Sequence, residues 1–127
     1  MSFEIGIIKG ENWPKADTIG WCDPFLIIEY TDGGYEKSYK TNYVTNTSNP
    51  FWNEIILVGD IERDFVIKCF DKDTFSKDDY LGKIRILLPK IEHKQVLIFN
   101  VDLEEKYKHK RKDNTKETTV ILTFRPI

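Results

Sequence analysis

The sequence predicts an all-β protein, an eight-stranded antiparallel β-sandwich with Greek-key connections that forms one domain over residues 1–127. Three observations support this fold class. Short runs that alternate apolar and polar residues recur along the chain, turn residues separate these runs, and no segment keeps a helical periodicity over three turns. Such a pattern is typical of a sandwich. With 40% hydrophobic residues, a chain of 127 residues can bury a real core.

The expected strands follow one another from the start of the sequence to its end. Phe3, Ile5 and Ile7 occupy every second position and give the first strand one strongly apolar face. Pro24 favours an extended start for the second strand, and the Asp-Gly-Gly turn at 32–34 ends it. We expect strands at residues 3–8, 25–30, 35–44, 51–58, 64–70, 80–88, 95–103 and 118–124.

Two of the connecting segments stand out. Residues 89–94 leave room for a short helical turn, and residues 104–117 are polar, basic and free of apolar periodicity. The second segment is therefore predicted to be a loop. The third strand, 35–44, contains many polar residues, as expected of a half-exposed edge strand.

Composition excludes several classes of protein. No run of about 18 apolar residues is present, and the first residues lack the apolar core of a signal peptide. No lipid-anchor motif is encoded. We therefore expect a cytoplasmic protein, in which Cys22 and Cys69 are free thiols. A net charge of −2 gives no reason to expect a nucleic-acid partner.

Five aspartates stand on two loops that adjoin apolar strands. Asp17 and Asp23 flank an early loop, and Asp71, Asp73 and Asp79 follow a later strand. Any one of them is most simply a solvated turn residue. The pattern of possible ligands consists of carboxylates and lacks His or Cys, which favours calcium, with its about 6–8 oxygen ligands, over magnesium with its tighter octahedral geometry. Two unit charges about 4 Å apart at a dielectric near 20 repel by roughly 4 kcal/mol, so five clustered aspartates predict a cation site.

Three motifs, in this order and spacing, resemble the C2 domain, a calcium-dependent lipid-binding module. The early loop, from Asp17 to Asp23-Pro24-Phe25, resembles the first calcium loop of that family. Lys40-Thr41 followed by the segment Asn-Pro-Phe-Trp-Asn-Glu at 49–54 resembles its central signature. Asp71-x-Asp73 with Asp79 and Leu81-Gly82 resembles the third calcium loop. The start of the chain on the strand that feeds the first loop resembles the permuted, type II-like topology of the family.

The resemblance implies a ligand set for more than one calcium ion. Lys72 would offer its backbone carbonyl and Ser76 its hydroxyl. The carboxylate ligands would be Asp17, Asp23, Asp71, Asp73 and Asp79. Residues beside these ligands in the family dip into lipid. Here we expect membrane contact from Ile19, Trp21 and Phe75, although Thr18 replaces the usual bulky apolar residue after the first ligand.

The implied function is calcium-dependent binding to anionic phospholipid membranes, with recruitment from the cytoplasm when calcium rises. Bound calcium would reverse the negative charge of the loops and leave positions open for a lipid phosphate. If each strand runs antiparallel to the last, the loop at 104–117 emerges beside the acidic loops. We then expect Lys108, Lys110, Arg111 and Lys112 to bind anionic headgroups, phosphatidylserine or phosphoinositide, unless they are simply a solvated charged loop.

Two other functions compete with this one. A C2-like domain could use its surface to bind another protein, with calcium incidental. The pattern of a strand followed by Asp71-x-Asp73-x-Thr74 also resembles the Asp-nucleophile motif of haloacid-dehalogenase-type phosphatases. That enzyme fold needs alternating strands and helices and a longer chain, so we expect no enzyme.

Overall fold

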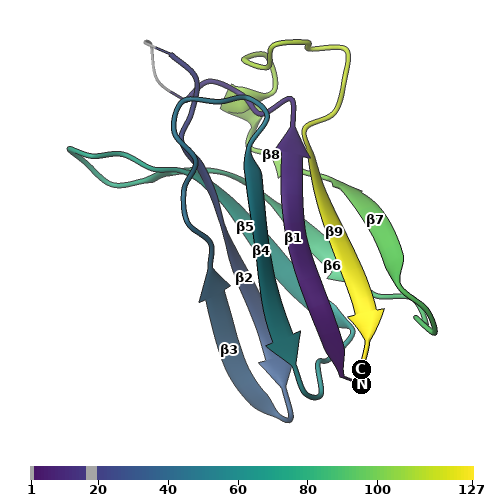
Figure 1. Ribbon diagram of the computed structural model, residues 1–127. Coiled ribbons are helices and arrows are strands. Elements are labelled where there is room, and N and C mark those ends of the chain that lie inside the picture. The colour runs from purple at the N-terminus through teal and green to yellow at the C-terminus, as the bar shows by residue number, and fades with distance from the viewer. Residues whose placement is uncertain (1, 17–19) are drawn as a thin grey trace.

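The computed structural model describes residues 2–16 and 20–127 as two antiparallel β-sheets packed against each other (Figure 1). The four-stranded sheet has the order β4-β1-β9-β7, and the five-stranded sheet has the order β3-β2-β5-β6-β8. The strands are β1 Phe3–Glu11, β2 Pro24–Asp32, β3 Tyr35–Lys40, β4 Phe51–Val58, β5 Asp64–Asp71, β6 Asp79–Leu87, β7 Gln95–Asn100, β8 Asp102–Leu103 and β9 Thr119–Pro126. The predicted all-β sandwich is confirmed.

The core forms where alternate residues of the two sheets face each other. Ile5 of β1 and Phe124 of β9 are partners in the strand ladder, and both are fully buried. Phe3 packs edge to face on Phe124, with 6.3 Å between the ring centroids. Cys22 and Cys69 are both buried in the same core, and within the described residues neither belongs to a disulfide. Each large apolar side chain buried in this way contributes about 1.5–3 kcal/mol.

The expected seventh strand, 95–103, is two strands in different sheets, which raises the number of strands in the described residues from eight to nine. β7 pairs with β9, whereas β8 pairs with β6. The chain changes sheets at the buried Val101. Inward-facing residues keep the same alternation through Val101 and Leu103, so apolar periodicity could not reveal the change.

Helical structure also differs from the expectation. Residues 89–94 contain only bends, and the helical turn that the structure describes is a 3-10 turn at Glu105–Tyr107 (η1), inside the predicted basic loop. No helix among the described residues is long and apolar enough to cross a membrane.

The loops that follow β1, β3, β5 and β8 lie at one end of the sandwich, and both termini lie at the other (Figure 1). We call the first end the loop pole; among the described residues it is formed by 12–16, 20–23, 41–50, 72–78 and 104–118. Backbone hydrogen bonds join these loops. The N–H of Thr47 donates to the carbonyl of Cys22 at 2.9 Å, and the N–H of Lys15 donates to the carbonyl of Lys110 at 3.0 Å. The loops expected at one pole are therefore together. The permuted connectivity itself stays a prediction.

Candidate functional site

Asp71 joins the two acidic loops. It is the last residue of β5, and its side chain is almost fully buried. Its Oδ1 accepts the backbone N–H of Asp23 at 2.7 Å, and the N–H of Lys72 donates to the carbonyl of Asp23 at 2.9 Å. Two aspartates that are 48 positions apart in the sequence are thus side by side at the loop pole.

Asp23 is held from a third loop by Asn46. The Asp23 Oδ1 accepts the backbone N–H of Asn46 at 2.6 Å, and the Asn46 Oδ1 accepts the backbone N–H of Trp21 at 2.7 Å. Asn46 has a φ of 51°, a left-handed conformation that Asn tolerates better than most residues. The sequence analysis missed this residue, and its place in a loop rich in Asn and Ser was the available signal.

The loop at 72–78 closes on itself. Asp73 accepts the backbone N–H of Phe75 at 3.0 Å and the Ser76 hydroxyl at 2.8 Å. These donors lower the pKa of Asp73, the Phe75 amide most strongly. The N–H of Asp73 donates to Asp78 Oδ1 at 2.9 Å, and Lys72 Nζ lies 3.6 Å from the same oxygen. Asp78, which the sequence analysis did not single out, therefore shapes this loop.

The possible metal ligands at the loop pole are of the chemical type that calcium prefers. Asp23, Asp71, Asp73 and Asp79 offer hard carboxylate oxygens, which calcium prefers. In residues 2–16 and 20–127, however, no three Asp, Glu, His or Cys side chains lie close enough together to hold an ion as they stand. Instead, protein N–H and O–H groups bind several of these oxygens.

Two expected site residues lie outside the described residues. Asp17, the first predicted ligand, and Ile19, a predicted membrane contact, are both in the segment that the structure does not describe. Their roles stay predictions.

The two described membrane-contact candidates differ in their surroundings. Phe75 is 98% exposed on the loop between β5 and β6. Trp21 is partly buried, and the ammonium of Lys15 lies 4.8 Å from its ring centroid. Of these two side chains, Phe75 could therefore enter a membrane interface directly, whereas Trp21 would leave its contact with the Lys15 ammonium.

Arg111, a predicted headgroup residue, has its guanidinium engaged within the basic loop. Its Nε donates to Lys108 O at 3.1 Å, its Nη2 donates to Asn114 O at 3.2 Å, and its Nη1 donates to Lys116 O. The guanidinium thus holds the basic loop in shape. Lys108 is also engaged, because its ammonium pairs with Glu105 at 3.0 Å.

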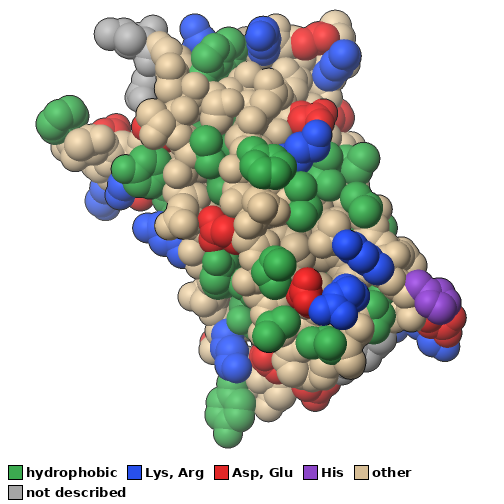
Figure 2. Space-filling view, in the orientation of Figure 1, with side chains coloured by type: hydrophobic (Ala, Val, Ile, Leu, Met, Phe, Trp, Pro, Cys, Tyr) green, Lys and Arg blue, Asp and Glu red, His purple; other side chains and the backbone are tan. Residues whose placement is uncertain are grey.

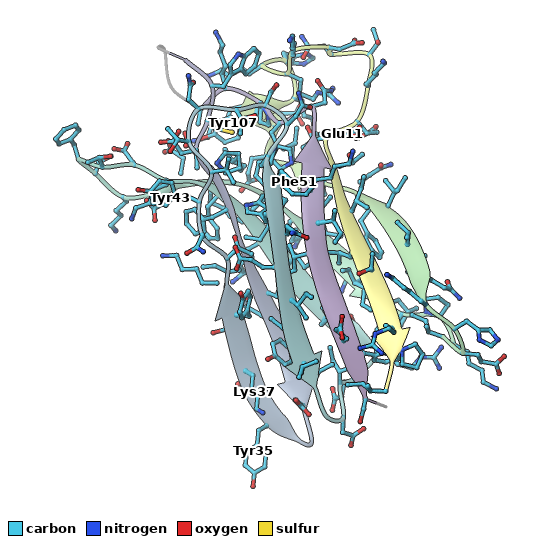
Figure 3. The ribbon with its side chains drawn as sticks, in the orientation of Figure 1. Glu11, Tyr35, Lys37, Tyr43, Phe51 and Tyr107 are labelled. Atoms are coloured by element: carbon cyan, nitrogen blue, oxygen red, sulfur yellow. The ribbon has the colours of Figure 1, made fainter. Side chains whose placement is uncertain are left out.

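Lys110 and Lys112 are the exposed candidates for headgroup binding. Both side chains belong to exposed residues of the loop pole. The ammonium of Lys110 lies 5.8 Å from the ring centroid of Tyr107, and that of Lys106 lies 5.1 Å from it. Tyr107 is buried at the loop pole (Figure 3). Burial raises the pKa of its hydroxyl, and the nearby charge of Asp79 adds to the rise.

Asn12 fastens the basic loop to the end of β1. Its Nδ2 donates to the carbonyls of Asp113 and Lys116, at 2.9 Å each, and its Oδ1 accepts the N–H of Asp113 at 3.1 Å. The Thr118 hydroxyl donates to the carbonyl of Asn12 at 2.7 Å. Asn12 was not among the predicted site residues, yet it fixes the basic loop beside the acidic ones.

A family model for the C2 domain matches residues 1–103. The chain belongs to the C2 domain family. Among curated relatives, it is 31% identical over 105 residues to an uncharacterized protein of Schizosaccharomyces pombe, covering 80% of this chain and 8% of that protein. It is 29% identical over 106 residues to human synaptotagmin-7, covering 79% of this chain and 26% of that protein. The C2 chain thus spans a small part of these relatives.

Solved C2 domains share the same fold. A single C2 domain of plant extended synaptotagmin 1 matches with a TM-score of 0.76 at 15% identity, covering 99% of this chain and 95% of that chain. A calcium-bound structure of a pair of C2 domains from extended synaptotagmin 2 matches with a TM-score of 0.74 at 21% identity, covering 98% of this chain and 44% of that chain. At these identities the likeness establishes the fold alone.

The C2 sandwich also bears on the phosphatase alternative. In the described residues, Asp71 ends a strand of an antiparallel sheet, Asp73 follows it, and η1 is the helical element. The alternating strands and helices that such a phosphatase needs are missing from this part of the chain. C2 domains do occur within enzymes, however, since mouse cytosolic phospholipase A2 delta is 28% identical over 83 residues, covering 63% of this chain and 10% of the enzyme.

Proposed function

We propose that this C2 domain binds calcium through the aspartates of the loop pole and then binds anionic phospholipid membranes. The observation that supports the proposal best is the direct hydrogen bond from Asp23 to Asp71, which joins the two acidic loops. Together with Asp73 and Asp79, these residues provide only oxygen donors. Calcium would come to this pole as the cytoplasmic concentration rises, and the domain would move from the cytoplasm to a membrane.

The residues of the loop pole would act through charge. Without ions, four described carboxylates repel an anionic bilayer. Bound calcium would supply positive charge and open coordination positions for a lipid phosphate. Phe75 would then add apolar contact at the interface, and Lys110 and Lys112 would each add about 1 kcal/mol near an anionic surface.

Liposome cosedimentation across calcium concentrations tests this function. Vesicles of phosphatidylserine, of phosphoinositide and of neutral phosphatidylcholine should be compared. We expect calcium-dependent binding to the anionic vesicles, and we expect Asp71→Asn with Asp73→Asn to abolish it. Asp64→Asn, at the other end of β5 with an exposed ion pair to Arg85 at 3.7 Å, is the matched control and should bind normally.

A second comparison tests the basic loop. Because Arg111 and Lys108 are engaged within the protein, the informative variant is Lys110→Gln with Lys112→Gln. It should weaken binding to anionic vesicles, most clearly at low salt. Lys90→Gln with Lys94→Gln removes the same charge far from the loop pole and serves as the control. Equal binding by both double variants would remove the basic loop from the proposal.

Calcium-dependent melting separates this function from protein binding. A ligand that binds the folded state raises the melting temperature. A rise with calcium but no cosedimentation with any vesicle would support the protein-interaction alternative. No response to calcium in either measurement would contradict the proposed calcium site.

A further inference from the structure

β7 is an edge strand of the four-stranded sheet, and its sequence has none of the usual protection. Its residues, Gln-Val-Leu-Ile-Phe-Asn at 95–100, include no charge and no Pro. Sheets normally guard exposed edges with charges, Pro or bulges, because an open edge pairs with other strands. The edge strand β3, by contrast, contains Glu36, Lys37 and Lys40, and the edge strand β4 contains Glu54 and a left-handed Asn53 with φ 49°.

The ladder register shows which backbone groups of β7 point outward. Val101 donates its N–H to the carbonyl of the directly opposite Thr118 at 2.8 Å. Hydrogen-bonded pairs alternate along an antiparallel ladder, so residues 95, 97 and 99 bond to β9. The N–H and C=O groups of Val96, Ile98 and Asn100 therefore point away from β9. In the described residues β9 is the strand that pairs with β7, so these groups form a free edge.

The side chains at this edge are apolar as well. Val96 and Ile98 lie on the outer face and are 62% and 66% exposed. Leu97 and Phe99 face the other way and pack against the core, only partly buried. Hydrophobic side chains also reach the surface on the side of the molecule where β7 lies (Figure 2). An added strand would pair with the backbone groups and place its own side chains beside these.

We propose that β7 pairs antiparallel with β7 of a second copy of this chain. Outward groups lie on even-numbered residues in both copies, so Val96 or Ile98 of one copy would pair with Ile98 of the other. Residues of the same parity lie on the same face. The two outer faces would then be continuous, and a single two-fold axis would relate the copies.

This arrangement is closed and self-complementary. A two-fold contact uses the same patch on both copies and leaves no further edge of that kind open, whereas head-to-tail pairing of β7 with the β4 edge of the next copy would continue without end. The edge has no charge with which to select a charged peptide of another protein. A second β7 would offer matching backbone N–H and C=O groups and apolar side chains. Two four-stranded sheets would become one sheet of eight strands, with Val96 and Ile98 of the two copies in cross-strand contact at its centre.

Sedimentation velocity in EDTA and without lipid tests the dimer independently of the proposed calcium and membrane function. We expect a monomer–dimer equilibrium for the unchanged chain. Ile98→Pro removes one outward N–H but no bond to β9, a position where an edge strand tolerates Pro. It should raise the dimer dissociation constant by roughly tenfold or more, because the two-fold axis doubles each lost hydrogen bond. Ile98→Val, which keeps the N–H, should leave the equilibrium nearly unchanged.

A second pair of variants guards against a folding defect in Ile98→Pro. Ile98→Lys places a charge at the centre of the edge and should give a monomer with an unchanged melting temperature. Leu87→Lys places the same charge at another exposed apolar residue, which is 76% exposed at the end of β6, and should leave the dimer intact. A monomer at every soluble concentration of the unchanged chain, or a dimer that survives both Ile98 variants, would overturn the proposal.

Discussion

Asp71 and Asp79 face each other as the last pair of the β5–β6 ladder. A register shift between Cys69 and Phe70 produces this pairing, since without it Asp71 would lie opposite Tyr80. Bulges next to functional sites often re-aim a side chain in this way. Like charges directly opposite in a sheet destabilise it by about 0.2–1 kcal/mol. The ladder thus holds two carboxylates together at a cost that a bound cation would remove.

Asp79→Asn should therefore stabilise the protein when calcium is absent. Removal of one of the two facing charges should raise the free energy of unfolding by roughly 0.5 kcal/mol. The same change should reduce the stabilisation by added calcium. Thermal melting in EDTA and in calcium measures both effects. A variant that is less stable in EDTA would contradict the repulsion between the two carboxylates.

Gly82→Ala should disturb the contact between β6 and β8. A Cβ atom at Gly82 would lie 2.3 Å from the carbonyl oxygen of Asp102 and 2.8 Å from the Cα of Leu103. These are backbone atoms of β8, which cannot move as freely as a side-chain end. We expect a loss of about 1–3 kcal/mol in urea unfolding. Gly59→Ala, whose added Cβ would have its nearest contact at 3.6 Å with Asp32, should change stability by much less.

Phe75→Ala should separate membrane binding from stability. Because Phe75 is 98% exposed, its loss should change the free energy of unfolding by no more than about 0.5 kcal/mol. Vesicle binding in calcium should nevertheless weaken by roughly tenfold, since part of a large apolar side chain leaves the interface. Tyr35→Ala is the control, since Tyr35 is 74% exposed at the start of β3, away from the loop pole (Figure 3). Equal effects of both variants would argue against insertion of Phe75.

Asp32, at the end of the sandwich opposite the loop pole, should make the stability of the protein depend on pH in the acid range. Backbone N–H groups of Asp60 and Gly59, at 2.8 and 3.1 Å, lower the pKa of its carboxyl, and the charge of Lys37 adds a smaller effect. A pKa lowered by folding stabilises the folded state at neutral pH, and this contribution is lost as the pH falls from about 4 through the lowered pKa.

Asp32→Asn should therefore flatten the acid side of a stability–pH curve measured by urea unfolding. Carboxyl NMR signals should report the Asp32 titration directly. Lys37→Gln should leave most of the lowering of the pKa in place, because the amides cause the larger part. A titration of Asp32 at its ordinary pKa would contradict the two amide hydrogen bonds.

Asn12→Gly should loosen the basic loop without straining the backbone. Asn12 has a φ of 57°, which Gly adopts at no steric cost, so the variant removes the side-chain bonds to residues 113, 116 and 117 without straining the turn. We expect a loss of about 1–3 kcal/mol, from two or three hydrogen bonds. Hydrogen exchange of the Asp113 amide should accelerate. An exchange rate equal to that of the unchanged chain would show that Asn12 does not hold the loop.

Sequence patterns predicted the strands and the position of the acidic loops because both leave local signals. Alternation of apolar residues marked the strands, and antiparallel order placed the loops at one pole. The same alternation continues across Val101, so the change of sheet there was invisible. Charge alone could not separate Lys110 from Arg111, because only the folded loop brings carbonyl groups to the guanidinium. The role of Asn46 depends on contacts with a distant loop in the same way.

The closed form of the 72–78 loop has a consequence for timing. Asp73 already has donors on both of its oxygens, from Phe75 and Ser76. An incoming cation would therefore meet an ordered loop. It would have to displace two local hydrogen-bond donors, but it would not have to wait for a disordered loop to fold. When the ion leaves, the same two donors are within reach to take back the oxygens. Such a loop would return to its ion-free conformation at the rate at which the ion and the two hydrogen-bond donors exchange on the Asp73 oxygens.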